Sequence, residues 1–263
     1  MPAATLEHVT SSDGTTLGVW RSGTGPALVL VHGTTADHTR WSRVIPGFSE
    51  RFSVHAMDRR GRGASGDSAT YSYEQEGRDV AAVVHHAGRP RNLVGHSFGG
   101  LCALEAALLV ELDRLVLYEP PLPVGIQITS NDTVARLDDL IARNQREDAL
   151  LVFFREVVRA PEQQVEMLRT QASWPARVAA AHTVVREVRL EHSYRPDFAR
   201  LRNMAVPTLL LLGTESPSFL RAATERIHAV LPNSRIHEFA GQQHLAMDAV
   251  PDEFVRVVSE FLS

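Results

Sequence analysis

Short apolar runs alternate with helix-like segments along most of the chain, and this alternation most constrains its fold. Residues 27–31 read Ala-Leu-Val-Leu-Val without a polar residue, and residues 115–118 and 208–212 are almost as apolar. A strand without polar alternation is buried on both faces, as in a parallel sheet that is covered by helices. The sequence therefore predicts an α/β fold with a mostly parallel sheet of the eight-stranded type, flanked by helices.

The order of the elements follows from the same patterns. The predicted strands span residues 6–10, 16–21, 27–31, 52–57, 92–94, 115–118, 208–212 and 235–239. The predicted helices of the core span residues 72–87, 101–110, 219–231 and 251–262. The first two strands flank a Ser-Ser-Asp-Gly turn, whose glycine can take a positive φ, so we expect them to form a hairpin.

Residues 121–201 differ from the rest of the chain, because they are helical in period and contain no clear strand. Such a segment, inserted between two strands of a parallel sheet, would lie over the carboxyl edge, where ligands bind in open α/β sheets. We therefore expect residues 1–120 and 202–263 to form the core and residues 121–201 to form a helical cap. The cap residues that could line a pocket or simply pack helices together are Trp174, Phe153, Phe154, Met167 and Leu168.

The pentapeptide Gly-His-Ser-Phe-Gly at residues 95–99 has the pattern G-x-S-x-G and lies between a predicted strand and a predicted helix. A sharp turn at this place would present the hydroxyl of Ser97 as a nucleophile. The amide of Phe98, at the start of the helix, would donate to a developing oxyanion. A second donor is expected from the His-Gly-Thr-Thr loop at residues 32–35, and we assign it to the amide of Thr34.

His244 follows the last predicted strand and is the expected general base. Histidine suits this task because its unperturbed pKa lies near neutrality. Its late position also agrees with the order nucleophile, acid, histidine that is typical of hydrolases in which a G-x-S-x-G turn, the nucleophile elbow, carries the serine. We expect His32 to be a structural, hydrogen-bonding residue.

Four motifs together resemble the α/β-hydrolase superfamily. They are HGTT at residues 32–35, DRRGRGASGDS at 58–68, GHSFGG at 95–100 and GQQHLAMD at 241–248. The chain looks most similar to the serine esterases, lactonases, cofactor-free perhydrolases and C–C bond hydrolases that carry a helical cap. The resemblance covers nearly the whole chain outside the cap, and it implies that the segment at 58–65 is a loop that holds the fold.

The triad acid has two candidate positions. In the family that this chain resembles, the acid usually follows the strand after the cap, but Ser216 stands there and Glu215 comes one residue early. Glu119, at the end of the strand before the cap, resembles the acid of some haloalkane dehalogenases. A carboxylate at a buried strand end is hard to explain as a solvated charge. We favour Glu119 and keep Glu215 as the alternative; Asp248 is weaker and is expected to cap the final helix.

A serine at the elbow points to acyl transfer through an acyl-enzyme, whereas related enzymes with an aspartate there attack alkyl carbons or epoxides. The predicted function is hydrolysis of an ester, thioester or lactone of a small, largely apolar substrate. Two alternatives stay open. One is a C–C bond hydrolase or a cofactor-free lyase or cyclase on the same residues, and the other is a ligand-binding protein without catalysis.

The composition limits the kinds of partner and cofactor that we expect for this chain. The net charge of −4 gives no electrostatic reason to expect nucleic acid or an anionic membrane. The single cysteine, Cys102, cannot form an internal disulfide, and no Cys/His spacing resembles a zinc site. No secretory signal or membrane-spanning run is visible. We expect a cytoplasmic, soluble enzyme that binds a small-molecule substrate and uses no cofactor or metal; a monomer and a homodimer both stay open.

Overall fold

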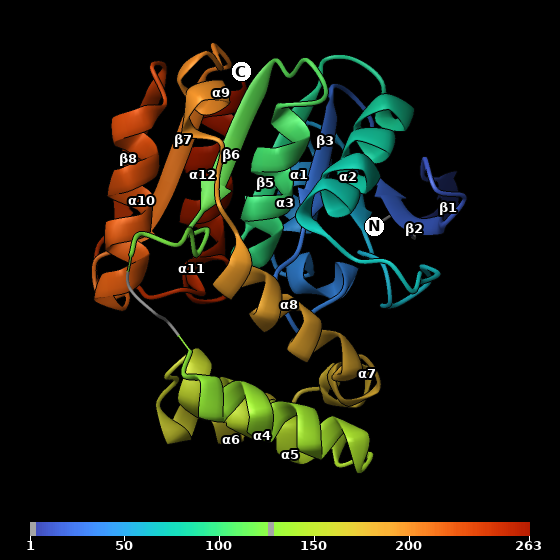
Figure 1. Cartoon of the computed structure of the whole chain (residues 1–263). Coiled ribbons are helices and arrows are strands. Elements are labelled where there is room, and N and C mark those ends of the chain that lie inside the picture. Colours follow the sequence, from blue (N-terminus) through green and yellow to red (C-terminus); the bar gives the residue numbers. More distant parts are fainter. Residues whose placement is uncertain (1–3, 126–128) are drawn as a thin grey trace.

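A sheet of eight strands forms the centre of the computed structural model, which describes residues 4–125 and 129–263 (Figure 1). The strands are β1 (Thr5–Thr10), β2 (Thr16–Ser22), β3 (Ala27–Val31), β4 (Ser53–Met57), β5 (Asn92–His96), β6 (Arg114–Tyr118), β7 (Thr208–Gly213) and β8 (Ser234–Phe239). Their order is β1-β2-β4-β3-β5-β6-β7-β8. The β1–β2 and β2–β4 pairs are antiparallel and the other pairs are parallel, which confirms the predicted fold class.

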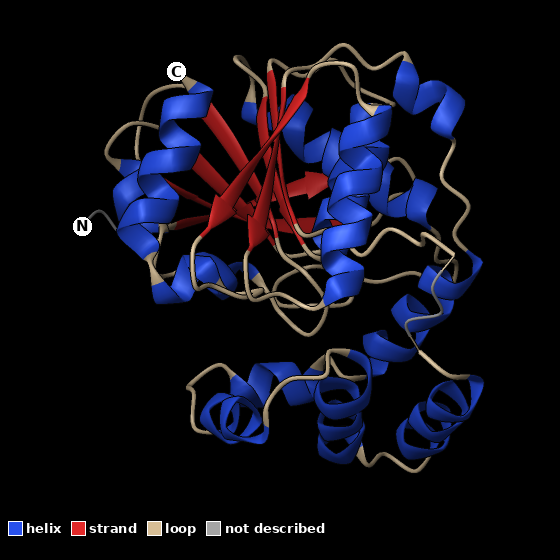
Figure 2. Cartoon of the chain, turned by 90° about the vertical axis from the view of Figure 1, so that its left-hand side faces the viewer, coloured by secondary structure: helices blue, strands red, loops and turns tan. Residues whose placement is uncertain are grey.

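Helices cover both faces of the sheet (Figure 2). The helices of the core are α1 (Ile45–Ser49), α2 (Tyr73–Ala87), α3 (Phe98–Ala107), α10 (Ser218–Val230), α11 (Ala246–Ala249) and α12 (Pro251–Leu262), with a short 3-10 helix, η1 (His38–Trp41). Ser72 caps α2 by accepting a hydrogen bond from the amide of Gln75. This cap explains why the helix begins where the sequence predicts it.

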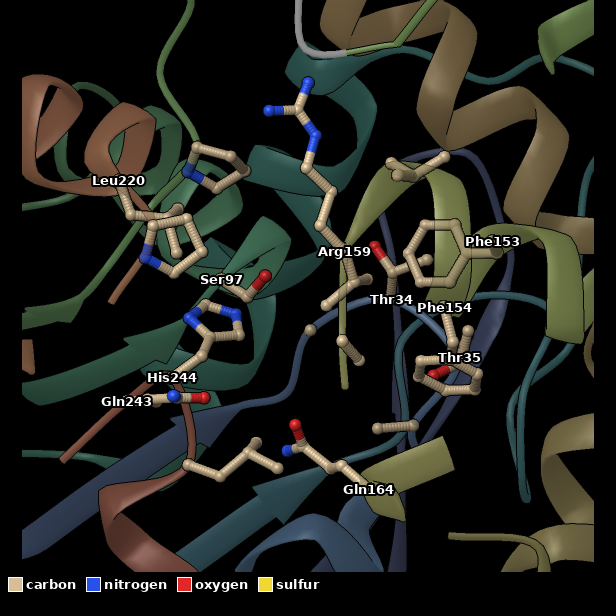
Figure 3. Close-up of a pocket in the computed structure, with 18 of the residues that line it drawn as sticks. Thr34, Thr35, Ser97, Phe153, Phe154, Arg159, Gln164, Leu220, Gln243 and His244 are labelled. Carbon is tan, nitrogen blue, oxygen red and sulfur yellow. The ribbon is translucent and has the colours of Figure 1, made fainter. Parts of the chain in front are cut away.

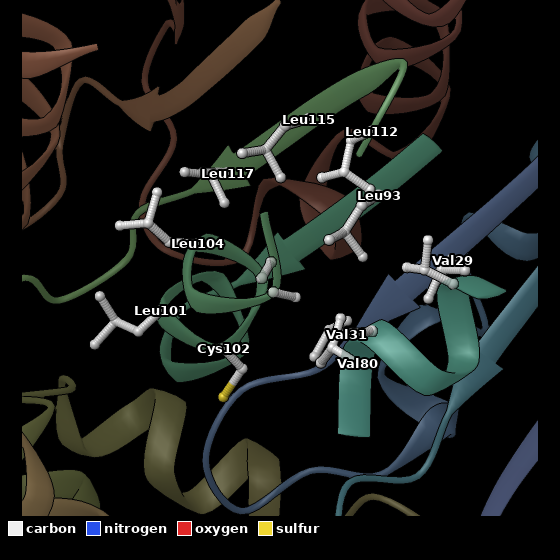
Figure 4. Packing of buried hydrophobic residues seen from close by; sticks show 14 of the residues in the cluster. Val29, Val31, Val80, Leu93, Leu101, Cys102, Leu104, Leu112, Leu115 and Leu117 are labelled. Atoms are coloured by element: carbon white, nitrogen blue, oxygen red, sulfur yellow. The ribbon is translucent and has the colours of Figure 1, made fainter. Parts of the chain in front are cut away.

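Side chains of the central strands alternate between two hydrophobic cores. Val29, Val31 and Leu93 pack against α2 and α3 on one face (Figure 4). Leu28 and Leu30 point to the other face, where they pack with residues of α1 and α12. Because successive residues of a strand point to opposite faces, apolar runs such as β3 are what a doubly covered sheet requires.

The segment between β6 and β7 is helical, as predicted, and most of it lies as a separate layer beneath the sheet in Figures 1 and 2, whereas its last helix, α9, lies at the opposite end of the molecule beside the core. Its elements are α4 (Asn131–Ala142), α5 (Arg146–Val152), the π-helical turn η2 (Phe153–Val157), α6 (Glu162–Arg169), α7 (Trp174–Ala179), α8 (His182–Ser193) and α9 (Phe198–Arg202). Helices α4 to α8 share a hydrophobic cluster of their own, built around residues such as Leu137, Leu150 and Val184. This cap has its own core, while the boundaries at residues 121 and 201 stay predictions.

Two details differ from the sequence predictions. Helix α3 begins at Phe98, directly after Ser97, whereas the sequence predicted a start at residue 101. Asp248 does not cap the final helix, because it lies inside the separate helix α11 and its carboxylate pairs with Arg40. Helix α12 has no side-chain cap and begins at Pro251. Proline suits this first position, because an N–H in the first turn of a helix has no partner within the helix and its loss costs nothing there. No helix in the described ranges has the length and apolarity to cross a membrane.

Candidate active site

Ser97 occupies a strained turn between β5 and α3. Its φ of 56° and ψ of −128° are rarely adopted by residues with a side chain. Its amide donates to the carbonyl oxygen of Tyr118 at 2.9 Å, which ties the turn to the neighbouring strand. Two glycines make room for it. A Cβ on Gly99 would lie 2.3 Å from the carbonyl oxygen of His32, and a Cβ on Gly33 would lie 2.8 Å from Cβ of Ser97.

His244 is held by a carboxylate at the end of β6. The Nδ1 of His244 lies 2.6 Å from Oε2 of Glu119, a residue with no exposed surface. The other carboxylate oxygen of Glu119 accepts hydrogen bonds from the amide of Gly213 at 2.7 Å and from Oγ of Ser216 at 2.5 Å. Because the carboxylate accepts at Nδ1, it leaves Nε2 of the ring available as a base.

The structure separates the two candidate acids. Glu215 is exposed and lies on an outer groove beside Gln242, to whose carbonyl oxygen its backbone amide donates at 2.9 Å. Its carboxylate has no contact with His244 among the described residues. Ser216, which stands where the family usually has its acid, donates its hydroxyl to Glu119 instead. The geometry therefore favours Glu119 over Glu215.

Ser97 and His244, the expected nucleophile and base, line one pocket. Figure 3 shows the Ser97 hydroxyl beside the His244 ring, across the pocket from Phe153 and Phe154. No hydrogen bond joins Ser97 Oγ to this ring in the described structure. Such bonds are often long or poorly aligned before a substrate is bound, so the arrangement is compatible with proton transfer.

Two residues that the sequence analysis did not single out position His244. Nε2 of His96 donates to the backbone carbonyl oxygen of His244 at 3.0 Å. The hydroxyl of Tyr118 donates to the carbonyl oxygen of Gln243 and accepts from the amide of Ala246 at 3.0 Å. Burial, together with the neighbouring His244, keeps the pKa of His96 well below its usual value, so this ring is a neutral donor. Their positions next to Ser97 and Glu119 are the only signal that the sequence offers for them.

The two expected oxyanion donors come from different segments of the chain that meet at the serine. Phe98 is the first residue of α3, and the first amides of a helix have no partner within the helix. Thr34 belongs to the loop after β3 and lines the pocket with Ser97. Gly33 allows this loop to approach the serine closely. These positions agree with the expected roles, which we retain as part of the proposal below.

The pocket itself has a volume of about 130 Å³. A cavity of roughly 150 Å³ holds a molecule the size of benzene, so this space suits a small substrate or acyl group. Its apolar lining comes mostly from the cap and from α10, and includes Phe153, Phe154, Val157, Leu168, Phe219 and Leu220. Of the other cap residues named from the sequence, Trp174 packs in the cap core and Met167 is exposed beside the outer groove.

Known proteins share this architecture along the whole chain. Residues 28–257 match the model of the alpha/beta hydrolase family. The chain belongs to the alpha/beta hydrolase family. The crystal structure of an alpha/beta hydrolase from Sphaerobacter thermophilus superimposes on this hydrolase with a TM-score of 0.87 and 33% sequence identity, covering 98% of this chain and 100% of that one.

Two further relatives of this hydrolase are esterases. Esterase RhEst1 from a Rhodococcus species has a TM-score of 0.77 and 23% identity, covers 97% of this chain and 98% of its own, and supports the fold alone. A pimeloyl-[acyl-carrier protein] methyl ester esterase from Nitrosomonas europaea is 27% identical over 252 residues, covering 89% of this chain and 94% of its own. The family assignment confirms the predicted resemblance, the fold class and the prediction that the chain is an enzyme, a hydrolase.

The segment at residues 58–65 of this hydrolase has a structural part, as expected. The carboxylate of Asp58 is buried and accepts hydrogen bonds from the amides of His38 and Ala64 at 2.8 and 2.9 Å. Although burial opposes ionisation, the hydrogen bond with the His38 ring and these two amide bonds lower the pKa of Asp58 to about 2. His32 is structural too, because its Nε2 accepts from the amide of Arg59 at 3.1 Å and burial lowers its pKa to about 3.

One group of side chains in the described part of the hydrolase has the composition of a metal site. Asp37, His38 and Asp58 bring potential ligand atoms within 4.8 Å of one another. Internal contacts already account for this arrangement, since Nδ1 of His38 lies 2.8 Å from Asp58 and Asp37 caps η1. We therefore assign no metal to it.

Proposed function

We propose that this hydrolase cleaves an ester, thioester or lactone of a small, largely apolar substrate through an acyl-enzyme on Ser97. The observation that carries the proposal is the buried Glu119 carboxylate on Nδ1 of His244, in a pocket that also holds the strained serine. A carboxylate, an imidazole and a serine hydroxyl that faces a pocket, in this order, form the arrangement that activates a serine for acyl transfer.

The reaction follows from the positions of these groups. Ser97 Oγ attacks the substrate carbonyl while Nε2 of His244 takes its proton. Glu119 keeps the ring in the required tautomer and stabilises the imidazolium. The amides of Thr34 and Phe98 donate to the oxyanion that forms. His244 then protonates the leaving group, and water, activated by the same ring, releases the acid.

Labelling with a fluorophosphonate tests this proposal, because the probe reacts only with an activated serine. We expect intact mass spectrometry to show one adduct on the wild type and none on Ser97→Ala. A short-chain p-nitrophenyl ester should be hydrolysed by the wild type and not by this variant. Failure of the wild type both to label and to hydrolyse would refute the proposal and favour a lyase with a closed cap or a binding protein.

Two amide substitutions identify the acid. Glu119→Gln should lower kcat by about 10⁴-fold, the size of loss seen when a triad acid is replaced by its amide. Glu215→Gln is its matched control, since this exposed carboxylate does not contact His244, and its kcat should stay within about twofold of the wild type. The opposite ranking of the two variants would assign the acid to Glu215.

A further inference from the structure

Arg177 is a buried cation in the lining of the pocket that holds Ser97 and His244. It belongs to α7 of the cap, and only 7% of its surface is exposed. One terminal nitrogen, Nη1, donates to the carbonyl oxygen of Thr35 at 3.1 Å and to its hydroxyl at 3.0 Å. Its Nε is buried and has no hydrogen-bond partner in the described structure.

No carboxylate in the described ranges lies within ion-pair distance of Arg177. The acidic groups that influence it electrostatically are Asp37 and Asp248. Asp248 pairs with Arg40, and Asp37 accepts from the amide of Thr39 at the start of η1. Burial and the nearby Arg40 lower the pKa of Arg177 to about 10, which still leaves the group charged at neutral pH. A buried charge without a counter-ion is costly, so its presence calls for a partner.

The place of Arg177 indicates where that partner would bind. Arg177 and Arg40 line both the pocket of Ser97 and His244 and an outer groove of about 910 Å³. Gln164 and Gln243 line both spaces as well, so polar groups gather where the two meet. Asp37, Glu215 and Asp248 line the outer groove too, but of these only Asp248 pairs with one of the two arginines, Arg40. Arg177 therefore keeps no carboxylate of the described residues within ion-pair distance. Much of the remaining lining of the pocket is apolar, although Arg159 and Glu191 line it too.

We propose that Arg177 binds a carboxylate carried by the substrate, so that the preferred substrates are esters or thioesters with a free acid group. A guanidinium suits this role because its fixed donors match the geometry of a carboxylate. The substrate would place its carbonyl at Ser97 and its acid group at the mouth of the pocket. This inference rests on the proposed ester hydrolysis and narrows it to anionic substrates.

A comparison of charged and neutral esters tests the inference. The p-nitrophenyl hemiesters of succinate and glutarate carry the acid in the acyl part, and 4-acetoxybenzoate carries it in the leaving group. Their neutral counterparts are p-nitrophenyl pentanoate and phenyl acetate. We expect the wild type to show a higher kcat/KM for at least one anionic ester than for its neutral counterpart. In Arg177→Gln, this ratio should fall about 10- to 100-fold, the size expected for a lost charged hydrogen bond.

The ratio separates recognition from a structural role. Loss of the bonds to Thr35 alone would lower the rates for both kinds of ester alike and leave the ratio unchanged, which would overturn the inference. Arg155→Gln is the control, because it removes an exposed cap arginine that pairs with Glu162 and does not line the pocket. Its ratio should equal that of the wild type.

Inhibition of the wild type keeps the test decisive if Arg177→Gln does not fold. Glutarate should compete with p-nitrophenyl pentanoate, and the neutral glutaramide should bind at least about tenfold more weakly. Equal inhibition by the two compounds would overturn the inference while ester hydrolysis stands. A wild type that hydrolyses no ester and takes no fluorophosphonate would instead overturn the proposed function.

Discussion

Glu187 connects the cap to the core, and its removal should destabilise the whole molecule. It lies in α8, and one carboxylate oxygen accepts from Nη2 of Arg59 at 2.7 Å and also from Nη2 of Arg62. All three side chains are buried, with at most 1% of their surface exposed. Although burial opposes ionisation, the two arginines lower the pKa of Glu187 to about 2.

The substitution Glu187→Gln removes the negative charge and keeps the shape. Arg59 would still pair with Glu76. Arg62 would keep no carboxylate partner among the described residues, because its ion pair is with Glu187. Breaking a buried ion pair on one side typically costs about 3–5 kcal/mol. At roughly 2 °C per kcal/mol for a chain of this size, the Tm at pH 7 should fall by about 6–10 °C.

Thermal unfolding followed by circular dichroism measures this effect. Glu162→Gln is the matched control, because it breaks an exposed cap pair with Arg155, and exposed pairs of this kind contribute little to stability. The depressed pKa also fixes the pH dependence. The ordinary value is 4.5, so the contribution of Glu187 is present above that pH and is lost as the pH falls toward 2. A Tm for Glu187→Gln within about 1 °C of the wild type at pH 7 would refute the reasoning.

Two further substitutions test the elbow and the pocket. Gly33→Ala places a Cβ 2.8 Å from Cβ of Ser97, so kcat for p-nitrophenyl esters should fall about 100-fold or more. Gly66→Ala is the control, because a Cβ there would have its nearest contact at 3.5 Å, and it should leave kcat unchanged. Equal rates for the two variants would contradict the packing argument. Burial and the Glu187 carboxylate raise the pKa of Glu191, a pocket residue, from 4.5 to about 8. Between these pH values the unfolded chain releases this proton and the folded chain keeps it, so the wild type loses stability as the pH rises. Glu191→Gln should therefore gain Tm relative to the wild type on going from pH 5 to pH 8.5, and a constant difference in Tm would show that the carboxyl is ordinary.

The sequence predicts the sheet well because its strands depend on local pattern. Runs such as β3 and β7 are buried along their entire length, and a short apolar run has few other ways to bury both faces. The predicted start of α3 is three residues too late, because Gly99 and Gly100 are weak helix formers. The turn at Ser97 overrides this preference, because a Cβ at Gly99 would collide with the backbone of His32. The short elements η1, α1 and α11 carry too little periodicity to be predicted.

The cap could be located from the sequence, but its attachment could not. Arg59 and Arg62 belong to a recognisable loop, and nothing in the loop shows that their partner is a glutamate more than a hundred residues later. The lack of an ion pair at Arg177 also follows only from the three-dimensional contacts, because the sequence contains more acidic than basic residues and could in principle pair every arginine. Only the fold decides which of them are left without a counter-ion.

The proposed triad shows the same division between local and tertiary information. Ser97 and His244 stand in short motifs whose chemistry is readable in the sequence, whereas the acid depends on which strand end faces the histidine. Here β6 and β7 are neighbours, so the carboxylate of Glu119 and the hydroxyl of Ser216 meet at 2.5 Å. Ser216, at the usual position of the acid, therefore donates a hydrogen bond to a carboxylate at the end of the adjacent strand. Since a hydroxyl at this position can support Glu119 but cannot replace it, a serine there is itself a reason to look for the carboxylate one strand away.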